Sequence, residues 1–180
     1  MLLICVRHTA VAVPKGVCYG RTDVPLAADF KHEAEAIAQR LRTYAFGRSD
    51  AVYTSPLSRC TRLADFCGFP RAIRDSRLLE MDFGSWEMQP WQTIDDPSLK
   101  AWFEDWIHRP SAAGDSFVAM LSRVGTLVDE LQGRACSRAL LFTHGGVIAC
   151  LSVLSGVYGP QEAFRSLPPC GSVVEIEMGK

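Results

Sequence analysis

The chain has 180 residues, of which 48% are hydrophobic, and its formal net charge is −1. This length is sufficient for one compact domain over residues 1–180 with a full apolar core. The near-zero charge and the lack of any Lys/Arg block argue against nucleic-acid and anionic-membrane partners, because both bind clustered positive charge.

The hydrophobic pattern alternates between short apolar runs and helical spacing, which is typical of an α/β fold. In the first part of the chain, we expect a strand at residues 2–6, a helix from Phe30 to Tyr44, a strand at 51–54 and a helix that starts at Ser55-Pro56 and ends before Gly68. In the second part, we expect a long helix capped by Asp115 or Ser116, a strand at 139–143, a helix at about 146–155 and a strand from Val173 to Met178. These elements predict a single-domain three-layer α/β/α sandwich, in which helices flank a mostly parallel central sheet.

The segment at about 86–110 departs from this alternation. It holds all four tryptophans, at positions 86, 91, 102 and 106, together with three prolines and an expected short helix from Leu99 to His108. We interpret it as an excursion from the core. Its tryptophans fit internal packing or a homodimer contact better than a shelf on which a flat base stacks.

The amino-terminal apolar run is too short for a signal peptide or a membrane span, because Arg7 and His8 end it and no basic segment precedes it. We therefore expect a cytoplasmic protein. The seven cysteines show no CxxC spacing and mostly lie within apolar patterns. Free thiols are the expectation for them, rather than disulfides or a metal site.

Two histidines follow buried strands. Arg7 and His8 end the first strand, and His144 follows the strand at 139–143. Open α/β sheets carry out their chemistry at the carboxyl ends of their strands. A neutral imidazole can attack phosphorus when its other ring nitrogen donates a hydrogen bond that fixes the tautomer. His8 is therefore the candidate nucleophile of a phosphoryl transfer.

Such a transfer also needs positive charge at the phosphoryl oxygens. Arg7 lies beside the nucleophile, and Arg59 can add a bidentate fork at the amino end of the helix opened by Ser55-Pro56. His144 could hold a further oxygen, and the glycine that follows it, Gly145, lets the backbone come close.

The leaving group needs a proton donor. Glu80 is the first candidate because it follows the apolar pair Leu78-Leu79, whose burial would keep the carboxyl protonated near neutrality. Asp82 and Glu87 are close alternatives.

These motifs, in this order, resemble the histidine phosphatase (phosphoglycerate mutase-like) superfamily. The residues that carry the resemblance are Arg7-His8-Thr9, Ser55-Pro56-Leu57-Ser58-Arg59, Leu79-Glu80, Phe83-Gly84-Ser85-Trp86-Glu87 and Thr143-His144-Gly145-Gly146. The resemblance implies a phosphohistidine on His8, phosphoryl binding by Arg7, Arg59 and His144, and Glu80 as the acid and then the base for water. It implies no metal and no cofactor.

Thr9 and the segment Gly16 to Leu26 resemble the alpha-ribazole phosphatase branch, whose members remove the phosphate of alpha-ribazole 5′-phosphate in cobalamin biosynthesis. The resemblance implies that the substrate, a small-molecule phosphate monoester, contacts Thr9, Cys18, Tyr19 and Gly20. The loop from Ala10 to Pro14 differs from that of glycolytic mutases, which points away from mutase activity.

One departure from the family pattern is Asp115, which replaces a longer glutamate and is expected to alter substrate contacts. Two other enzymes remain open, a broad-specificity small-molecule phosphatase and a phosphoglycerate mutase. From another class, the chain could be a non-catalytic module that binds phosphorylated protein.

Overall fold

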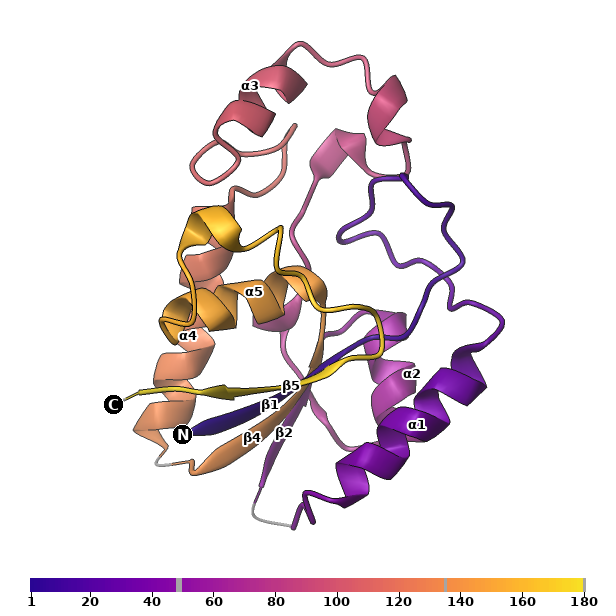
Figure 1. Cartoon of the computed structure of the whole chain (residues 1–180), viewed down its shortest axis with the longest axis vertical. Helices are drawn as coiled ribbons and strands as arrows, with labels where there is room; N and C mark the ends of the chain where they lie inside the picture. Colours follow the sequence, from indigo (N-terminus) through magenta and orange to yellow (C-terminus); the bar gives the residue numbers. More distant parts are fainter. Residues whose placement is uncertain (48–49, 135, 180) are drawn as a thin grey trace.

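The computed structural model describes residues 1–47, 50–134 and 136–179, and Figure 1 shows a twisted sheet at its centre. The sheet has the strand order β3-β2-β4-β1-β5. Its strands are β1 (Leu2–Arg7), β2 (Ala51–Thr54), β3 (Ile73–Arg74), β4 (Arg138–Thr143) and β5 (Val173–Glu177). Only β5 runs antiparallel to its neighbour, so the prediction of a mostly parallel sheet is confirmed.

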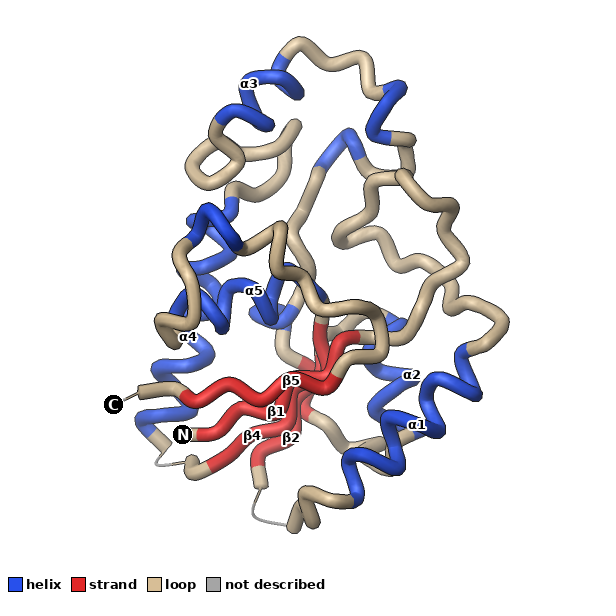
Figure 2. Tube along the Cα trace, viewed as in Figure 1, coloured by secondary structure: helices blue, strands red, loops and turns tan. Residues whose placement is uncertain are grey.

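Helices cover both faces of the sheet, with α1 and α2 on one side and α4 and α5 on the other (Figure 2). The α-helices of the described residues are α1 (Phe30–Arg42), α2 (Ser58–Phe66), α3 (Ser98–Glu104), α4 (Phe117–Gly133) and α5 (Gly145–Leu154). Within β1, Leu3 packs into the core on the α4 and α5 side, whereas Ile4 packs into the core beneath α1 and α2. A strand buried on both faces reads as a continuous apolar run, which is why β1 and β4 were recognisable in the sequence. The three-layer α/β fold is therefore confirmed.

Several boundaries differ from the expected ones. The second helix begins at Ser58 rather than at Ser55. The first ends at Arg42, before the expected Tyr44, and Ala45 then adopts a left-handed φ of 46°. The helix expected to reach His108 ends at Glu104, because Asp105 leaves the helical region and its carboxylate contacts the His108 ring instead.

The tryptophan-rich excursion lies beyond the carboxyl ends of the parallel strands, with α3 at its far end (Figure 1). Trp86 and Trp102 are 1% and 4% exposed, as internal packing requires, and the Trp86 indole donates to Asp96 at 2.7 Å. Within the described ranges, no helix combines the length and apolar character needed to cross a bilayer.

Candidate active site

His8 follows the carboxyl end of β1 and is 1% exposed. Its Nδ1 donates to the Thr9 carbonyl at 2.7 Å, which leaves the lone pair on Nε2. Burial, followed by the charges of Arg59 and Arg7, lowers the pKa of His8 to about 3. The ring is therefore neutral near pH 7, with its tautomer fixed, as an imidazole nucleophile requires.

His144 follows β4, and its ring centroid lies 5.2 Å from that of His8. Its Nε2 donates to the Ser55 hydroxyl at 2.8 Å, while its Nδ1 accepts from Arg59 Nε at 3.3 Å. Burial first, and the neighbouring positive charges second, hold the pKa of His144 well below its ordinary value. Both ring nitrogens are engaged by the protein, so the predicted phosphoryl contact would require Nε2 to turn its proton away from Ser55.

Arg59 lies in the first turn of α2 and is fully buried. Its Nη1 donates to the Thr22 carbonyl at 2.8 Å and its Nη2 to the Gly20 carbonyl at 2.5 Å. The guanidinium also lies 5.6 Å from the centre of the Tyr19 ring. Since a guanidinium carries more N–H donors than these contacts use, Arg59 can still donate to an anion.

A carboxylate lies at the amino end of α2. The Asp23 carboxylate accepts from the backbone N–H of Ser58 at 2.9 Å and from its hydroxyl at 2.8 Å. A carboxylate thus already caps this helix.

Arg7, the last residue of β1, donates through Nη1 to the Pro168 carbonyl, and its buried Nε has no hydrogen-bond partner among the described residues. Its guanidinium lies directly over Gly145. A Cβ on that glycine would come within 3.0 Å of Arg7 Cζ and 3.1 Å of Nη1. Gly145 therefore makes room for the arginine at the start of α5.

The two arginines share an electrostatic feature. In the described part of the chain, neither Arg7 nor Arg59 forms an ion pair with a carboxylate. Cations held away from water without a counter-charge are costly. An anion bound beside His8 would supply that charge.

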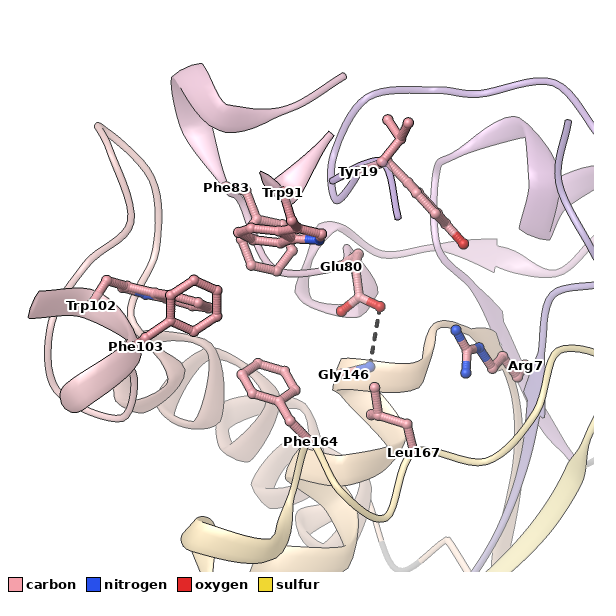
Figure 3. A pocket seen from close by; sticks show the side chains of 11 residues that line it. Arg7, Tyr19, Glu80, Phe83, Trp91, Trp102, Phe103, Gly146, Phe164 and Leu167 are labelled. Carbon is pink, nitrogen blue, oxygen red and sulfur yellow. Dashed lines mark hydrogen bonds between the residues drawn. The ribbon is translucent and has the colours of Figure 1, made fainter. Parts of the chain in front are cut away.

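Glu80 faces the same space as Arg7 (Figure 3). Its Oε2 accepts from the Gly146 backbone N–H at 3.1 Å, and its Oε1 accepts from Met81 N–H at 2.9 Å. A Cβ on Gly146 would lie 2.2 Å from Glu80 Oε1. The second glycine therefore makes room for a carboxyl group, as Gly145 does for a guanidinium.

The two alternative carboxylates have other partners. Asp82 pairs with Arg21 at 3.2 Å and accepts from Gly84 N–H at 2.8 Å. Glu87 accepts from the backbone N–H groups of Arg21 and Thr22 at 2.8 and 2.6 Å. Burial alone would raise the pKa of Glu87, but hydrogen bonds led by that of the Thr22 hydroxyl hold it below its ordinary value. Of the three candidates, Glu80 is the one that lines the cavity.

We call His8, Arg7, Arg59, His144 and Glu80 the phosphoryl site. A cavity of about 320 Å³ adjoins it and is lined by Arg7, Val17, Tyr19, Glu80, Phe83, Trp91, Trp102, Phe103, Gly146, Phe164 and Leu167. Among these lining residues, Arg7 and Glu80 carry the charges, and most of the others are apolar.

The rest of the cavity wall is dominated by an aromatic chamber, which consists of Phe83, Trp91, Trp102, Phe103 and Phe164 (Figure 3). The Trp91 and Trp102 rings are nearly parallel, with an angle of 11° and centroids 5.9 Å apart. Phe103 is 56% exposed, so the chamber is open to solvent on that side.

Of the four predicted substrate contacts, Tyr19 lines the cavity. Burial raises the pKa of Tyr19, so its hydroxyl stays protonated and able to donate. Thr9 and Cys18 are buried, and a Cβ on Gly20 would lie 1.9 Å from the Met81 carbonyl. Thr9 and Gly20 instead support the phosphoryl site through their carbonyls on His8 and Arg59. Direct substrate contact by Thr9, Cys18 and Gly20 stays a prediction.

Asp115 does not line the cavity. Its Oδ2 pairs with Arg21 at 2.8 Å and with Arg123 at 3.4 Å. An effect of this shorter side chain on substrate contacts stays a prediction. Sequence reasoning also missed Phe164, whose loop carries no periodic signal.

Among the described residues, no group of three or more His, Cys, Asp or Glu side chains is arranged to hold a metal ion. Arg7 and Arg59 are the arginines of the phosphoryl site.

Comparison with known proteins identifies related sequences. The family model of the histidine phosphatase superfamily (branch 1) matches residues 3–180. A probable phosphoglycerate mutase of Yersinia enterocolitica is 30% identical over 158 residues, which cover 82% of this chain and 70% of the relative. The adenosylcobalamin/alpha-ribazole phosphatase of Escherichia coli K12 is 29% identical over 188 aligned positions, covering 98% of this chain and 90% of the relative.

Two solved structures are similar to this chain over its whole length. A candidate alpha-ribazole-5′-P phosphatase from Escherichia coli K-12 has a TM-score of 0.84 at 25% identity, over 100% of this chain and 91% of the other. A phosphoglycerate mutase from Thermus thermophilus has a TM-score of 0.78 at 29% identity, over 100% and 95% of the two chains.

Proposed function

The chain belongs to the histidine phosphatase superfamily, and from this premise we propose that it is a phosphomonoesterase that forms a phosphohistidine on His8. One observation carries the proposal. A buried, neutral imidazole with a free Nε2 lies beside two guanidinium groups, Arg7 and Arg59, that have no carboxylate partner among the described residues. This arrangement suits a phosphoryl dianion that reacts with the ring.

The reaction would proceed in two steps. In the first, His8 Nε2 forms a bond to phosphorus while the phosphorus–oxygen bond to the leaving group breaks, and Glu80 gives its proton to the departing oxygen. In the second, the Glu80 carboxylate takes a proton from water, the water oxygen bonds to phosphorus, and the phosphorus–nitrogen bond breaks. Inorganic phosphate leaves, and both side chains return to their starting protonation states.

The aromatic chamber favours alpha-ribazole 5′-phosphate as the substrate, in the assembly of cobalamin. Its leaving group ends in a planar benzimidazole, which Trp91 and Phe103 can stack upon or enclose. The E. coli relative whose name includes alpha-ribazole phosphatase supports the same choice. A phosphoglycerate carries a carboxylate, and no described lining residue other than Arg7 offers it a positive charge, so a mutase is the weaker proposal.

A broad-specificity phosphatase is the second candidate, and the exposed Phe103 favours it, because an open chamber admits leaving groups of varied length. A non-catalytic phosphoprotein-binding module is disfavoured, since a binder has no use for an aligned nucleophile and acid.

The test is kcat/KM for phosphate release from alpha-ribazole 5′-phosphate, 3-phosphoglycerate, a nucleoside monophosphate and phenyl phosphate. A preference of about 100-fold or more for alpha-ribazole 5′-phosphate, roughly 2.7 kcal/mol, would support the substrate assignment. Similar rates across the panel would indicate the broad-specificity enzyme, and conversion of 3-phosphoglycerate without phosphate release would indicate a mutase. Turnover that survives His8→Ala would rule out the phosphohistidine, and no turnover at all would leave the binding module.

A further inference from the structure

Arg123 projects from α4 toward the segment that carries Glu80, although it lies outside the cavity. Its guanidinium is mostly buried, with 19% of the side chain exposed. Its partners are mainly backbone carbonyls rather than carboxylates. It donates to the carbonyls of Arg77 and Leu79, both at 2.8 Å, to those of Glu80 at 3.4 Å and Ser76 at 3.5 Å, and to Asp115 Oδ2 at 3.4 Å.

These contacts hold the backbone of Glu80 on one side while its carboxyl is held on the other. The carbonyls of Leu79 and Glu80 are held by Arg123, and the Glu80 carboxyl is held by Gly146 at the start of α5. Because α4 and α5 pack on each other, the two attachment points keep a fixed separation. Resting on the phosphatase activity proposed above, we propose that Arg123 is a positioning residue that fixes Glu80 for proton transfer to the leaving group and from water.

Contacts that do not involve Arg123 anchor the residues just before and just after Leu79 and Glu80. On the amino-terminal side, Thr143 Oγ1 donates to the Leu78 carbonyl at 3.0 Å, and Leu78 itself is fully buried. On the carboxyl-terminal side, Met81 is fully buried and Asp115 N–H donates to the Asp82 carbonyl at 2.8 Å. Between these anchors the guanidinium holds the carbonyls of Leu79 and Glu80, and before them it also holds those of Ser76 and Arg77. Loss of Arg123 should therefore loosen Glu80 rather than unfold the segment.

A neighbouring arginine provides a matched control. Arg77 lies on the same segment but pairs outward, with Asp75 at 2.6 Å and Glu130 at 2.8 Å. Within the described residues, the side chain of Arg77 donates no hydrogen bond to Leu79 or Glu80. An Arg77→Met variant removes the same charge and a comparable number of contacts without touching the proposed function of Arg123.

The experiment compares leaving groups. An alkyl phosphate needs a proton on its departing oxygen, whereas 4-nitrophenolate leaves without one. For Arg123→Met we expect kcat/KM to fall roughly 10- to 100-fold with an alkyl phosphate, because a displaced acid loses part of the roughly 100- to 10,000-fold that general acid catalysis contributes, and less than about threefold with 4-nitrophenyl phosphate. Since Glu80 also activates water, the variant should release 4-nitrophenolate in a burst followed by slow turnover. Arg77→Met should show neither effect.

A double variant decides whether Arg123 acts through Glu80. In a Glu80→Gln background, Arg123→Met should cost less than about twofold further with the alkyl phosphate, because the group it positions is already gone. Equal losses with both leaving groups, or full additivity in the double variant, would overturn the inference and leave the phosphatase proposal standing. If Arg123→Met does not fold, Arg123→Lys takes its place, because one ammonium cannot span both carbonyls and the same selective loss is expected. Lack of turnover by the unmodified protein would instead overturn the proposed function, and this inference with it.

Discussion

The phosphoryl site and the aromatic chamber adjoin each other but are built in different ways. Apart from Glu80, the groups of the phosphoryl site stand at strand and helix ends, and hydrogen bonds to neighbouring backbone and side-chain atoms hold their ring and guanidinium nitrogens. The chamber is formed by Phe83, by rings from the excursion and by Phe164 from the loop after α5, and contacts between rings such as those of Trp91, Trp102 and Phe103 hold it together. Directional bonds define a reacting geometry, whereas ring packing defines a shape that can vary without disturbing the chemistry.

The glycine pair at the start of α5 tests the phosphoryl site most severely. Gly146→Ala would place a Cβ 2.2 Å from Glu80 Oε1 and so displace the acid. We expect kcat with an alkyl phosphate to fall about 100-fold or more, because the contribution of general acid catalysis is lost.

In Gly145→Ala, the new Cβ would lie 3.0 Å from Cζ of the Arg7 guanidinium, which is a smaller overlap. We expect it mainly to raise KM and to weaken competitive inhibition by inorganic phosphate, roughly fivefold to tenfold.

Gly133→Ala is the control for this pair, since a Cβ there meets no atom within 4 Å. Its kinetics should match those of the unmodified protein. Equal effects of Gly145→Ala and Gly146→Ala on kcat and KM would mean that the two glycines do not separate the binding cation from the acid.

The chamber should respond to substitution by a change of substrate rather than a loss of chemistry. Trp91→Leu removes a ring that lines the cavity. Base–aromatic stacking contributes about 1–3 kcal/mol per base, so we expect kcat/KM for alpha-ribazole 5′-phosphate to fall roughly 10- to 50-fold. Methyl phosphate, which does not reach the chamber, should be hydrolysed at an unchanged rate.

Phe69→Leu is the matched aromatic control, because Phe69 packs against Phe46 and Phe142 on the opposite face of the sheet. It should change neither rate. If Trp91→Leu slowed the hydrolysis of methyl phosphate as much as that of alpha-ribazole 5′-phosphate, the chamber would be part of the reacting geometry. That result would contradict the proposed division between the phosphoryl site and the aromatic chamber.

The same division explains which features could be predicted from the sequence. His8, Arg7 and His144 were recognisable because each follows an apolar run that ends at the carboxyl edge of the sheet. Arg59 and Glu80 were recognisable because short local motifs carry them. Strand β3 was missed, since two residues show no periodicity.

Contacts made through space left no local signal. Asp23 caps α2 from 35 residues away, and Arg123 reaches the Glu80 carbonyl from 43 residues away. The need for Gly145 and Gly146 became visible only when Arg7 and Glu80 were seen against them. Sequence patterns report the periodicity of one segment, whereas these constraints depend on where a second segment arrives.

The smallest expected effect is on the free energy of unfolding. Its pH dependence should change with substitutions in the phosphoryl site but not with substitutions in the aromatic chamber. Burial lowers the pKa of His8 to about 3 and that of His144 well below its ordinary value, whereas both titrate near 6.5 in an unfolded chain. Below pH 6.5 the unfolded chain therefore binds protons that the folded protein excludes, so the free energy of unfolding falls as the pH falls. Between pH 7 and pH 5 we expect each histidine to lower it by about 2 kcal/mol in urea unfolding.

His8→Gln should remove the contribution of one histidine to this pH dependence. The free energy of unfolding of the variant should therefore fall by about 1–2 kcal/mol less than that of the unmodified protein between pH 7 and pH 5. Trp91→Leu should shift stability equally at both pH values, because its ring does not titrate. Hydrogen bonds from Arg138 and Arg77 lower the pKa values of Asp50 and Asp75, but carboxyls titrate near 4 in the unfolded chain, below this window. A pH dependence unchanged by His8→Gln would mean that the imidazole is not held neutral, and the proposed nucleophile would lose its main electrostatic support.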